Sequence, residues 1–365
     1  MRIEDAAVKT VFNANQQVDP ALDYTYDPIY RLIETMGREH VGQSAFASTA
    51  PSNNYRDFPF VGAAQQGDLQ ALRNYKEHYD YDQIGNFERM VHQATNGSWT
   101  RTYTYNEPSL IEPTKRSNRL SQTAVQTNGN PLAERYLYDT HGNITQMPHL
   151  PTMQWNFGEE LQATSRQMVN AGAPEMTYYV YGASGQRVRK ITERPNGSRK
   201  NERVYLGSFE TYSEFSVDVA LERQTLQVMD NKQRIAIVDT QTVDNGASVA
   251  APLPTPRYQL NNHLGSVSLE IDEVGGLISY EEYGSYGSAA FQAGRTAAEV
   301  SLKLYRYTGK ERDEENGLSY HGARYYAPWF GRWTSVDPAG LADSSNLYLY
   351  VKGNPVRHFD PTGGG

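Results

Sequence analysis

One short pattern recurs along this chain and sets the kind of structure that it can form. Each copy has two tyrosines at alternate positions, a residue suited to turns, usually a glycine soon after, and then a second apolar segment. Side chains at alternate positions share one face of a β-strand, and Asp, Asn and Gly close tight turns. Each copy therefore predicts a strand, a turn and a second strand. The copies are YTYDPIYRLIETMG from Tyr24, YDYDQIGNFERMV from Tyr79, YLYDTHGNITQM from Tyr136 and YVYGASGQRVRKI from Tyr179.

The same signal continues in a block from Tyr258, YQLNNHLGSVSLEIDEVGGLISYEEYGSYG, in which Glu273, Val274, Gly275 and Gly276 form the expected turn. Tyrosine outnumbers the other large rings, with 27 Tyr against 11 Phe and 4 Trp, and there are 30 Gly. Tyrosine packs across neighbouring strands while its hydroxyl stays hydrated or hydrogen-bonded. The sequence therefore predicts an all-β chain, with little helix, in which antiparallel hairpins build one long sheet with a partly solvated face.

Two stretches interrupt this pattern, at residues 41–75 and 240–257. Both are rich in Ala, Ser, Asn, Gln, Gly and Pro, which predicts surface excursions. A short helix can form within Asp68–Asn74. A second is expected in the segment AGRTAAEVSLK from Ala293, because its apolar residues fit a period of 3.6.

Length, charge and cysteine content exclude several classes of protein. A chain of 365 residues can bury a large core and is long enough for two or three domains. The net charge is -8 and Lys and Arg are dispersed among Asp and Glu, so no basic stripe is available for nucleic acid or an anionic membrane. The absence of Cys excludes disulfides, thiolate metal sites and cysteine nucleophiles. No signal peptide or membrane span is recognisable, which predicts a soluble chain.

The C-terminal part holds two copies of Asp-Pro-x-Gly, at Asp337–Gly340 and Asp360–Gly363. One interpretation is structural, because Asp accepts a backbone N–H, Pro fixes φ and Gly closes a type I turn. The other is catalytic, since two carboxylates brought together can share one proton, activate a water and polarise a peptide carbonyl, as in aspartic proteases. The residues alone leave both interpretations open.

Other signals for chemistry are weak. The eight His lack ligand spacing, so we expect no metal, and no nucleotide loop, dinucleotide fingerprint or nucleophile elbow is present, so we expect no cofactor. The alternating charges of Leu304–Glu315 predict a solvated strand and turn. A group of aromatic residues could bind a peptide or a glycan, although packing of the core is the favoured interpretation. The group comprises Tyr325, Tyr326, Trp329, Phe330 and Trp333.

Several motifs together resemble a known family. The Tyr-Asp units are followed by NNHLGSVSLEID, EEYGSYG and the dense segment YRYTGKERDEENGLSYHGARYYAPWFGRWTSVDPAGLADSSNLYLYVKGNPVRHFDPTG. This order resembles the RHS/YD-repeat family with its C-terminal RHS repeat-associated core. The opening region YTYDPIYRLIETMGREHVGQ is similar to the C component, or a fused B-C chain, of insecticidal toxin complexes. The resemblance predicts a YD-repeat sheet over residues 1–300 and an associated core over 301–365.

The resemblance implies a carrier protein that cuts itself. In this family a curved, spiral β-sheet forms part of a hollow shell, the associated core closes it, and a toxic polypeptide that follows the core is released by autoproteolysis. Asp337 and Asp360 match the family's paired aspartates, and Arg324 in GARYY matches an associated arginine. The family is cut after a leucine, so the matching bond joins Gly364 and Gly365. Because Gly364 replaces that leucine, we expect this chain to cut slowly or not at all.

The expected partners follow from the same resemblance. This chain is short for a closed shell, so the remainder of the shell or the B component of a toxin complex is expected to complete it, with a C-terminal effector polypeptide inside. Exposed edge strands would also permit self-association. The expected location is outside the cell, or on its surface, within a larger toxin complex. An alternative is a non-enzymatic adhesion or interaction module that presents a tyrosine-rich sheet to carbohydrate or protein.

Overall fold

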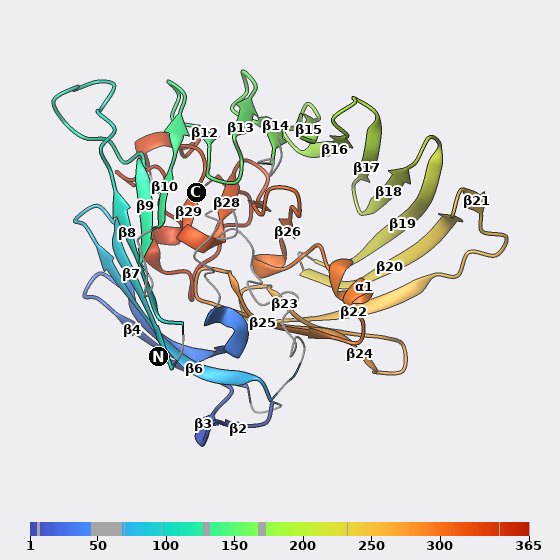
Figure 1. Cartoon of the computed structure of the whole chain (residues 1–365), viewed down its shortest axis with the longest axis horizontal. Helices are drawn as coiled ribbons and strands as arrows, with labels where there is room; N and C mark the ends of the chain where they lie inside the picture. The colour runs from blue at the N-terminus through green and yellow to red at the C-terminus, as the bar shows by residue number, and fades with distance from the viewer. Residues whose placement is uncertain are drawn as a thin grey trace. The chain divides into compact units, whose positions relative to one another are not determined.

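The computed structural model describes residues 1–5, 8–44, 68, 70–95, 97–126, 132–166, 173–231, 233–342 and 344–364. Within these residues antiparallel strands dominate, and helix is limited to α1 (Ala297–Ser301) and short 3-10 turns (Figure 1). No helix among them is long and apolar enough to cross a membrane. The predicted all-β fold class of antiparallel hairpins is therefore confirmed.

The chain divides into two compact units, which are described separately. Unit 1 comprises Met1–His149, Glu281–Ala293 and Gly317–Gly365, and unit 2 comprises Leu150–Tyr280 and Gly294–Asn316. Each unit thus combines segments that are distant in the sequence. The predicted division at residue 300 remains a prediction.

Unit 1 is built on an antiparallel sheet with the strand order β1-β4-β5-β6-β7-β8-β9-β10. These strands are β1 (Arg2–Glu4), β4 (Ala21–Tyr26), β5 (Leu32–His40), β6 (Leu72–Tyr81), β7 (Phe87–Ala94), β8 (Trp99–Thr104), β9 (Gln122–Gln126) and β10 (Leu132–Arg135). The smaller strands are β2 (Val11–Asn13), β3 (Gln16–Val18), β11 (Leu137–Tyr138), β12 (Ile144–Gln146), β27 (Ser319–Tyr320), β28 (Tyr325–Ala327) and β29 (Arg332–Trp333). The 3-10 turns are η1 (Val41–Ser44), η4 (Pro328–Phe330), η5 (Gly340–Ala342) and η6 (Val351–Gly353).

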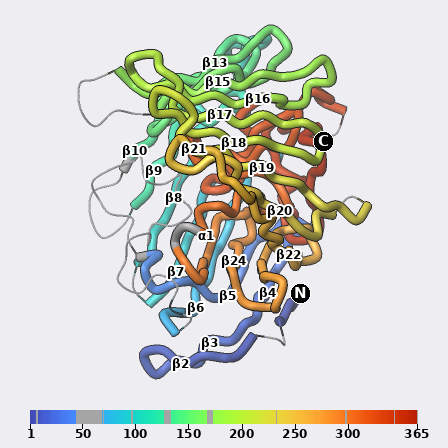
Figure 2. Tube along the Cα trace, turned by 90° about the vertical axis from the view of Figure 1, so that its right-hand side faces the viewer, coloured from blue at the N-terminus to red at the C-terminus, as the bar shows by residue number. Residues whose placement is uncertain are grey.

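Unit 2 continues the same plan, and almost every strand pairs with the next one along the chain (Figure 2). Its strands are β13 (Thr152–Trp155), β14 (Leu161–Ser165), β15 (Met176–Tyr181), β16 (Arg187–Glu193), β17 (Arg199–Leu206), β18 (Phe209–Phe215), β19 (Val219–Asp230), β20 (Gln233–Asp244), β21 (Ala247–Ser248), β22 (Thr255–Asn261), β23 (Val267–Ile271) and β26 (Glu311–Arg312). The residues of two further strands are divided between the units, and these strands are β24 (Leu277–Tyr283) and β25 (Ala289–Gly294). The 3-10 turn η3 (Tyr307–Gly309) belongs to unit 2. Pairing between sequence neighbours is the hairpin organisation that the sequence predicts.

Three of the four repeat copies have an aspartate at the first position of the turn, and the copy from Tyr179 has Gly182 there. Asp82 Oδ1 accepts hydrogen bonds from the backbone N–H of Ile84 at 3.0 Å and of Asn86 at 2.8 Å. Asp139 and Asp272 accept in the same way from the backbone two and four residues further on. A carboxylate in this position replaces backbone partners that the turn leaves without a hydrogen bond. The predicted turn chemistry of the repeats is therefore confirmed.

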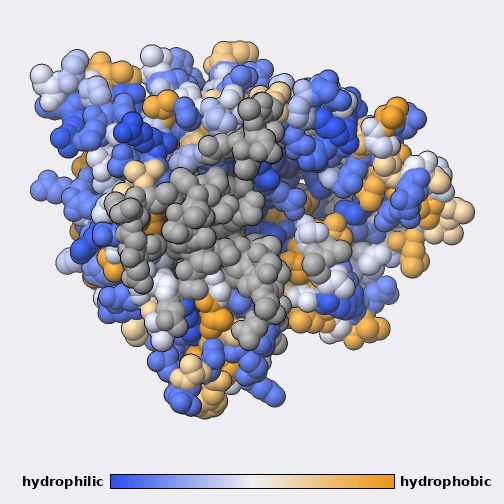
Figure 3. All heavy atoms as spheres, in the orientation of Figure 1, coloured by the Kyte–Doolittle hydropathy of each residue, from blue (hydrophilic) through white to orange (hydrophobic). Residues whose placement is uncertain are grey.

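The tyrosines of the repeats belong to the interior. The first tyrosine of each copy is at most 8% exposed, and these residues are Tyr24, Tyr79, Tyr136 and Tyr179. The second tyrosine of each copy is half-buried. In two copies its hydroxyl donates to a backbone oxygen, from Tyr81 to Leu32 O at 2.7 Å and from Tyr181 to Leu161 O at 2.8 Å. The face shown in Figure 3 carries mainly hydrophilic side chains with scattered hydrophobic ones. The repeat tyrosines thus pack the fold and do not form an exposed binding surface.

Two expectations about the polar stretches need correction. The helix expected within Asp68–Asn74 is wrong, because Asp68 Oδ1 accepts the N–H of Gln70 in a turn and β6 begins at Leu72. In residues 240–257 the expected exposure holds for most of residues 244–255, but β20 extends to residue 244, β22 begins at residue 255 and Arg257 is buried. Backbone hydrogen bonding to neighbouring strands determines the secondary structure there more than the local amino-acid composition does. The expected excursion at 41–75 falls mostly on residues 45–67, which lie outside the described residues.

The helix expected after Ala293 is confirmed as α1. Thr296 precedes it, and its Oγ1 accepts the N–H of Glu299 at 3.1 Å, while the Glu299 carboxylate accepts the Thr296 hydroxyl at 3.0 Å. Thr296 is thus a side-chain N-cap, which satisfies one N–H group at the start of the helix. The local sequence therefore determines this short helix.

A buried histidine joins three strands of unit 1. His92 Nε2 lies 3.1 Å from Oε1 of Glu39 and its Nδ1 lies 3.1 Å from Oε1 of Glu77. Its ring stacks on Tyr75 and on Trp99, with centroid distances of 5.3 and 5.1 Å. Burial alone would lower the pKa of His92, but the two carboxylates outweigh it and raise the pKa to about 9. The imidazolium is therefore the form that the fold favours.

The stability that His92 contributes is expected to depend on pH. Its pKa is raised from 6.5 to about 9, so the contribution is complete below pH 6.5 and is lost as the pH rises through 9. The loss is of the order of 1–3 kcal/mol. Urea unfolding at pH 6.5 and pH 9.5 measures it. His92→Gln should show a smaller fall over this interval, and an equal fall in both proteins would assign the pH dependence to other groups.

The charges of Leu304–Glu315 are largely buried, which corrects the expected solvated strand and turn. Asp313 is fully buried and pairs with Arg187 at 2.6 Å and with Lys190 at 2.8 Å, and Glu311 pairs with Arg187 at 2.7 Å. Burial opposes the charged form of Lys190, but the carboxylates outweigh it and hold its pKa well above the usual value. The carboxylates of this segment thus form ion pairs with cations on β16 and do not face water.

Candidate functional site

Both Asp-Pro-x-Gly segments form turns closed by their aspartates. Asp337 Oδ1 accepts the N–H of Ala339 at 2.8 Å. Asp360 Oδ1 accepts the N–H of Thr362 at 3.0 Å and of Gly363 at 2.7 Å. The structural interpretation of these motifs is therefore correct as far as one oxygen of each carboxylate is concerned.

The second oxygen of each carboxylate faces Arg324. The Nη2 atom of Arg324 lies 3.0 Å from Oδ2 of Asp337 and 3.4 Å from Oδ2 of Asp360. The arginine follows the loop of the β27–β28 hairpin, and its side chain is 2% exposed, while those of Asp337 and Asp360 are 11% and 4% exposed. The fold thus brings together the three residues that the sequence singles out, and each aspartate both closes its turn and contacts the shared cation.

The electrostatic balance of this cluster is uneven. Burial lowers the pKa of Arg324, and the carboxylates of Asp337 and Asp360 act in the opposite direction. A guanidinium keeps its charge in proteins, so one cation serves two carboxylates.

Aromatic residues pack against one face of the Arg324 guanidinium. The guanidinium carbon of Arg324 lies 4.1 Å from the ring centroid of Trp333, and Trp333 is 1% exposed. His321 packs edge-on against Trp333, and its Nδ1 lies 2.9 Å from the backbone oxygen of Asp360. Planar stacking of a guanidinium on an indole fixes its plane. Trp333 and His321 therefore set the positions of Arg324 and of the second turn.

The end of the chain lies against the same arginine. Arg324 Nε donates to the backbone oxygen of Gly363 at 2.5 Å. The expected cleavage residue Gly364 is partly exposed, and its N–H donates to Thr362 Oγ1 at 3.3 Å, whereas Gly365 lies outside the described residues. The peptide carbonyl that the cluster contacts is thus the one before Gly364.

Gly363 is required at its position for two reasons. Its φ is +73°, a conformation that side chains rarely adopt. A Cβ atom there would lie 2.8 Å from the backbone nitrogen of Arg324 and 3.2 Å from Cβ of His321. The glycine of the second turn therefore permits the close approach that brings the carbonyl to Arg324.

The sequence assigns one residue of the site, Trp333, to packing alone. The five aromatic residues of the C-terminal group are all at most 8% exposed, which confirms packing as their role. Trp333 has a second role as the support of Arg324. No local sequence signal identifies this role, because the stacking of Arg324 on Trp333 is a tertiary contact.

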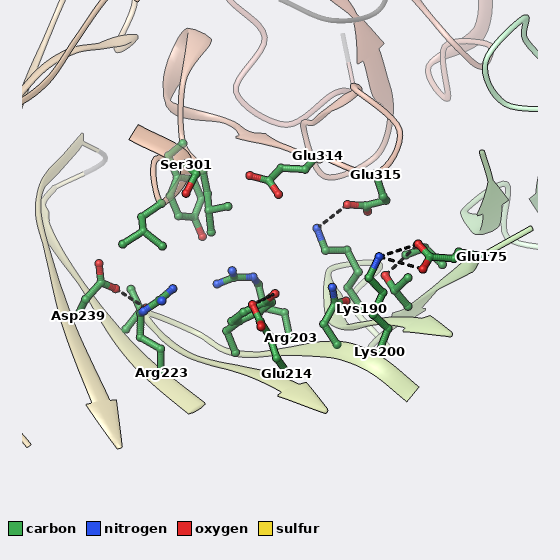
Figure 4. A pocket seen from close by; sticks show the side chains of 18 of the residues that line it. Glu175, Lys190, Lys200, Arg203, Glu214, Arg223, Asp239, Ser301, Glu314 and Glu315 are labelled. Carbon is green, nitrogen blue, oxygen red and sulfur yellow. Dashed lines mark hydrogen bonds and ion pairs between the residues drawn. The ribbon is translucent and has the colours of Figure 1, made fainter. Parts of the chain in front are cut away.

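A cavity of about 300 Å³ lies in unit 2, between the sheet and the segment from Ser301 to Glu315 (Figure 4). Lys200 pairs with Glu175 at 2.8 Å and Lys190 with Glu315 at 3.3 Å, as the dashed lines of Figure 4 mark. Charges that are already paired leave little net attraction for a charged ligand. In the described ranges no group of three or more His, Asp or Glu could hold a metal ion. The Arg324 cluster is therefore the candidate site.

Comparison with known proteins gives relatives along the whole chain, although no family model matches it. The chain is 33% identical to the toxin subunit YenC1 of Yersinia entomophaga over 365 residues, which cover 100% of this chain and 35% of that subunit. It is also 33% identical to YenC2 of the same organism, over 36% of its length. The tRNA nuclease WapA of Bacillus subtilis is 30% identical over 63% of this chain and 9% of its own length. The chain thus spans about a third of the length of the toxin subunits that it matches.

Solved structures agree with this similarity. The crystal structure of TcdB2-TccC3 superposes with a TM-score of 0.78 at 31% identity, over 100% of this chain and 17% of that chain. TcdB2-TccC3 without its hypervariable C-terminal region also gives a TM-score of 0.78 at 31% identity, over 16% of that chain. These findings confirm the resemblance and the fold class predicted from the sequence motifs.

Proposed function

We propose that this chain, a homologue of toxin C subunits, forms a segment of a shell that carries a toxic C-terminal polypeptide and frees it by cutting its own backbone. Similarity over the whole chain to YenC1 and to TcdB2-TccC3 supports a place in such a complex. The hairpins are suited to the wall of a shell, because almost every strand pairs with the next one and further strands can be added at the edges of the sheet. The rest of the shell or a B component completes the enclosure, and the assembled toxin acts outside the producing cell.

One observation carries the proposal of self-cleavage. Asp337 and Asp360 share Arg324, and the same arginine contacts the backbone oxygen of Gly363. In the proposed reaction one carboxylate accepts a proton from an attacking water, and a carboxyl group gives a proton to the departing amine. Arg324 stabilises the negative charge that develops on the carbonyl oxygen. Hydrolysis of one peptide bond consumes one water and needs no cofactor.

The test is the fate of a chain extended beyond residue 365 by a reporter peptide. We expect cleavage near residue 364 that Asp337→Asn or Asp360→Asn slows by at least about a hundredfold, because each change removes an acid–base group. Gel analysis with mass spectrometry measures the fraction cut over time. Gly364→Leu restores the apolar residue that the family carries and should raise the rate roughly ten- to a hundredfold.

Asp139→Asn is the matched control for these substitutions. Asp139 closes a turn in unit 1 through the same oxygen, and Asn keeps that acceptor. The control should therefore fold and cut as the parent chain does. Cleavage that continues at the parent rate in both active-site variants would exclude the aspartate pair. The alternative of a tyrosine-presenting adhesion module is not proposed, because the first tyrosine of every repeat is buried.

A further inference from the structure

We propose that the sheet of unit 2 dimerises through an apolar face that points away from its own buried charges, with a second copy of this chain as the partner. A sheet with one solvated side normally turns its polar residues to water, so an outward apolar face needs an explanation. The inference does not depend on the proposed self-cleavage, because its residues lie in unit 2, whereas Arg324, Asp337 and Asp360 belong to unit 1.

One face of this sheet is covered by the chain segment that follows β25. Gln227 Nε2 donates to the Tyr305 hydroxyl at 2.6 Å, and Arg257 Nη2 donates to Glu299 O at 3.0 Å. Arg257 also pairs with Glu270, which is fully buried. Successive side chains of a strand point to opposite sides of the sheet. The immediate neighbours of Gln227, Arg257 and Glu270 along their strands therefore point away from the covering segment.

The opposite face of the same strands is apolar over three neighbouring rows of cross-strand partners (Figure 2). Within the described part of unit 2, the rows that contain Leu226, Tyr258 and Leu260 hold only Leu, Ile, Val, Ala, Phe, Pro and Tyr between β17 and β24. We call these three rows the outer face. Its most exposed members are Leu206, Leu226, Tyr258, Leu260 and Leu277, at 64%, 45%, 45%, 48% and 39%. The usual distribution of polar and apolar side chains is thus inverted in this part of the sheet.

The size of the outer face fits a small interface between two copies. The face crosses the strands from β17 to β24 and extends over residues 256–260 of β22, which gives about 30 Å by about 13 Å, or roughly 400 Å². Apolar patches of this order are the largest on ordinary monomers and are often functional. The outer faces of two copies together approach the area of about 1,000 Å² that small specific interfaces bury.

A second outer face is the partner of matching chemistry. The rows of Leu226, Tyr258 and Leu260 offer no charged side chain, so a charged partner surface would lose hydration without gaining an ion pair. Two sheets can pack face to face about 10 Å apart with their strands about 30° from parallel. A two-fold axis brings the same patch of both copies together and needs no complementary charges. Dimerisation would thereby remove the exposed leucines of both copies from water.

The dimer is tested by analytical ultracentrifugation of the full chain between about 1 µM and about 100 µM. We expect a reversible monomer–dimer equilibrium with a Kd on the order of 10 µM, because the interface is small. Leu226→Lys and Leu260→Lys should each raise the Kd at least about tenfold, since each change places two lysines in an apolar contact. Leu110→Lys is the matched control, because Leu110 is 62% exposed in unit 1, and it should leave the Kd unchanged. A chain that stays monomeric at about 100 µM, or a dimer that neither outer-face variant weakens, overturns the proposal.

A single thiol locates the contact on the molecule. The chain has no Cys, and Val228 lies in the same row of the outer face as Tyr258, so Val228→Cys introduces one thiol there with little change in volume. Its rate of reaction with a thiol reagent should fall roughly fourfold between about 1 µM and about 100 µM protein, because the dimer covers it. Leu110→Cys should react at the same rate at both concentrations. If the Val228→Cys chain dimerises but its thiol reacts at one rate throughout, the interface lies elsewhere and the proposal is wrong.

Discussion

Replacing Arg324 by methionine is expected to lower the free energy of unfolding by roughly 3–5 kcal/mol and to stop self-cleavage. Methionine fills much of the same volume but removes the cation that the Oδ2 atoms of Asp337 and Asp360 share. Both carboxylates are largely buried, so their charges would face each other with little water between them. Urea unfolding followed by tryptophan fluorescence measures the loss, and the extended chain measures cleavage.

Two comparisons separate this effect from the loss of an ordinary ion pair. Arg89→Met breaks a surface pair with Asp80, whose partners are 53% and 31% exposed, and should cost less than about 1 kcal/mol. Combining Arg324→Met with Asp337→Asn and Asp360→Asn removes the uncompensated charges and should recover part of the stability without restoring cleavage. If Arg324→Met costs no more than Arg89→Met, the buried cluster does not hold the two turns together.

The sequence could supply the members of the site but not its geometry. Each Asp-Pro-x-Gly predicts its own turn, because the hydrogen bonds of Asp337 and Asp360 Oδ1 reach only two or three residues along the chain. The contact of both Oδ2 atoms with Arg324 depends on how the β27–β28 hairpin packs against both turns, and no local pattern encodes that packing. The contact of Arg324 with Gly363 O depends on it as well.

The same distinction explains the fold. The repeat turns could be predicted because their Asp and Gly act within about five residues, and the hairpin order followed from consecutive turns. The segment with residues 304–315 was misjudged because the partners of Asp313 are remote in sequence, with Arg187 separated from it by 126 residues and Lys190 by 123. A sequence with alternating charges is compatible both with a solvated turn and with a buried ion cluster, and only tertiary contacts distinguish the two.

Replacing Asp313 by asparagine is expected to cost roughly 3 kcal/mol or more of unfolding free energy. The change keeps the shape of the side chain but removes a charge that is fully buried and pairs with Arg187 at 2.6 Å and Lys190 at 2.8 Å. Glu311 and Glu315 still contact these cations, so the cluster keeps part of its negative charge and is only weakened. Chemical denaturation of the parent and the variant at neutral pH measures the difference.

The neighbouring Glu314 supplies the control, because it has the same charge and lies one residue away but is exposed. Glu314→Gln should change stability by less than about 0.5 kcal/mol, since a surface substitution removes no buried partner. Lys190→Met combined with Asp313→Asn removes opposite charges together and should cost less than the sum of the two single changes. Equal effects of Asp313→Asn and Glu314→Gln would mean that the segment is held by its apolar contacts and that its buried charges add nothing, which contradicts the ion-cluster account of unit 2.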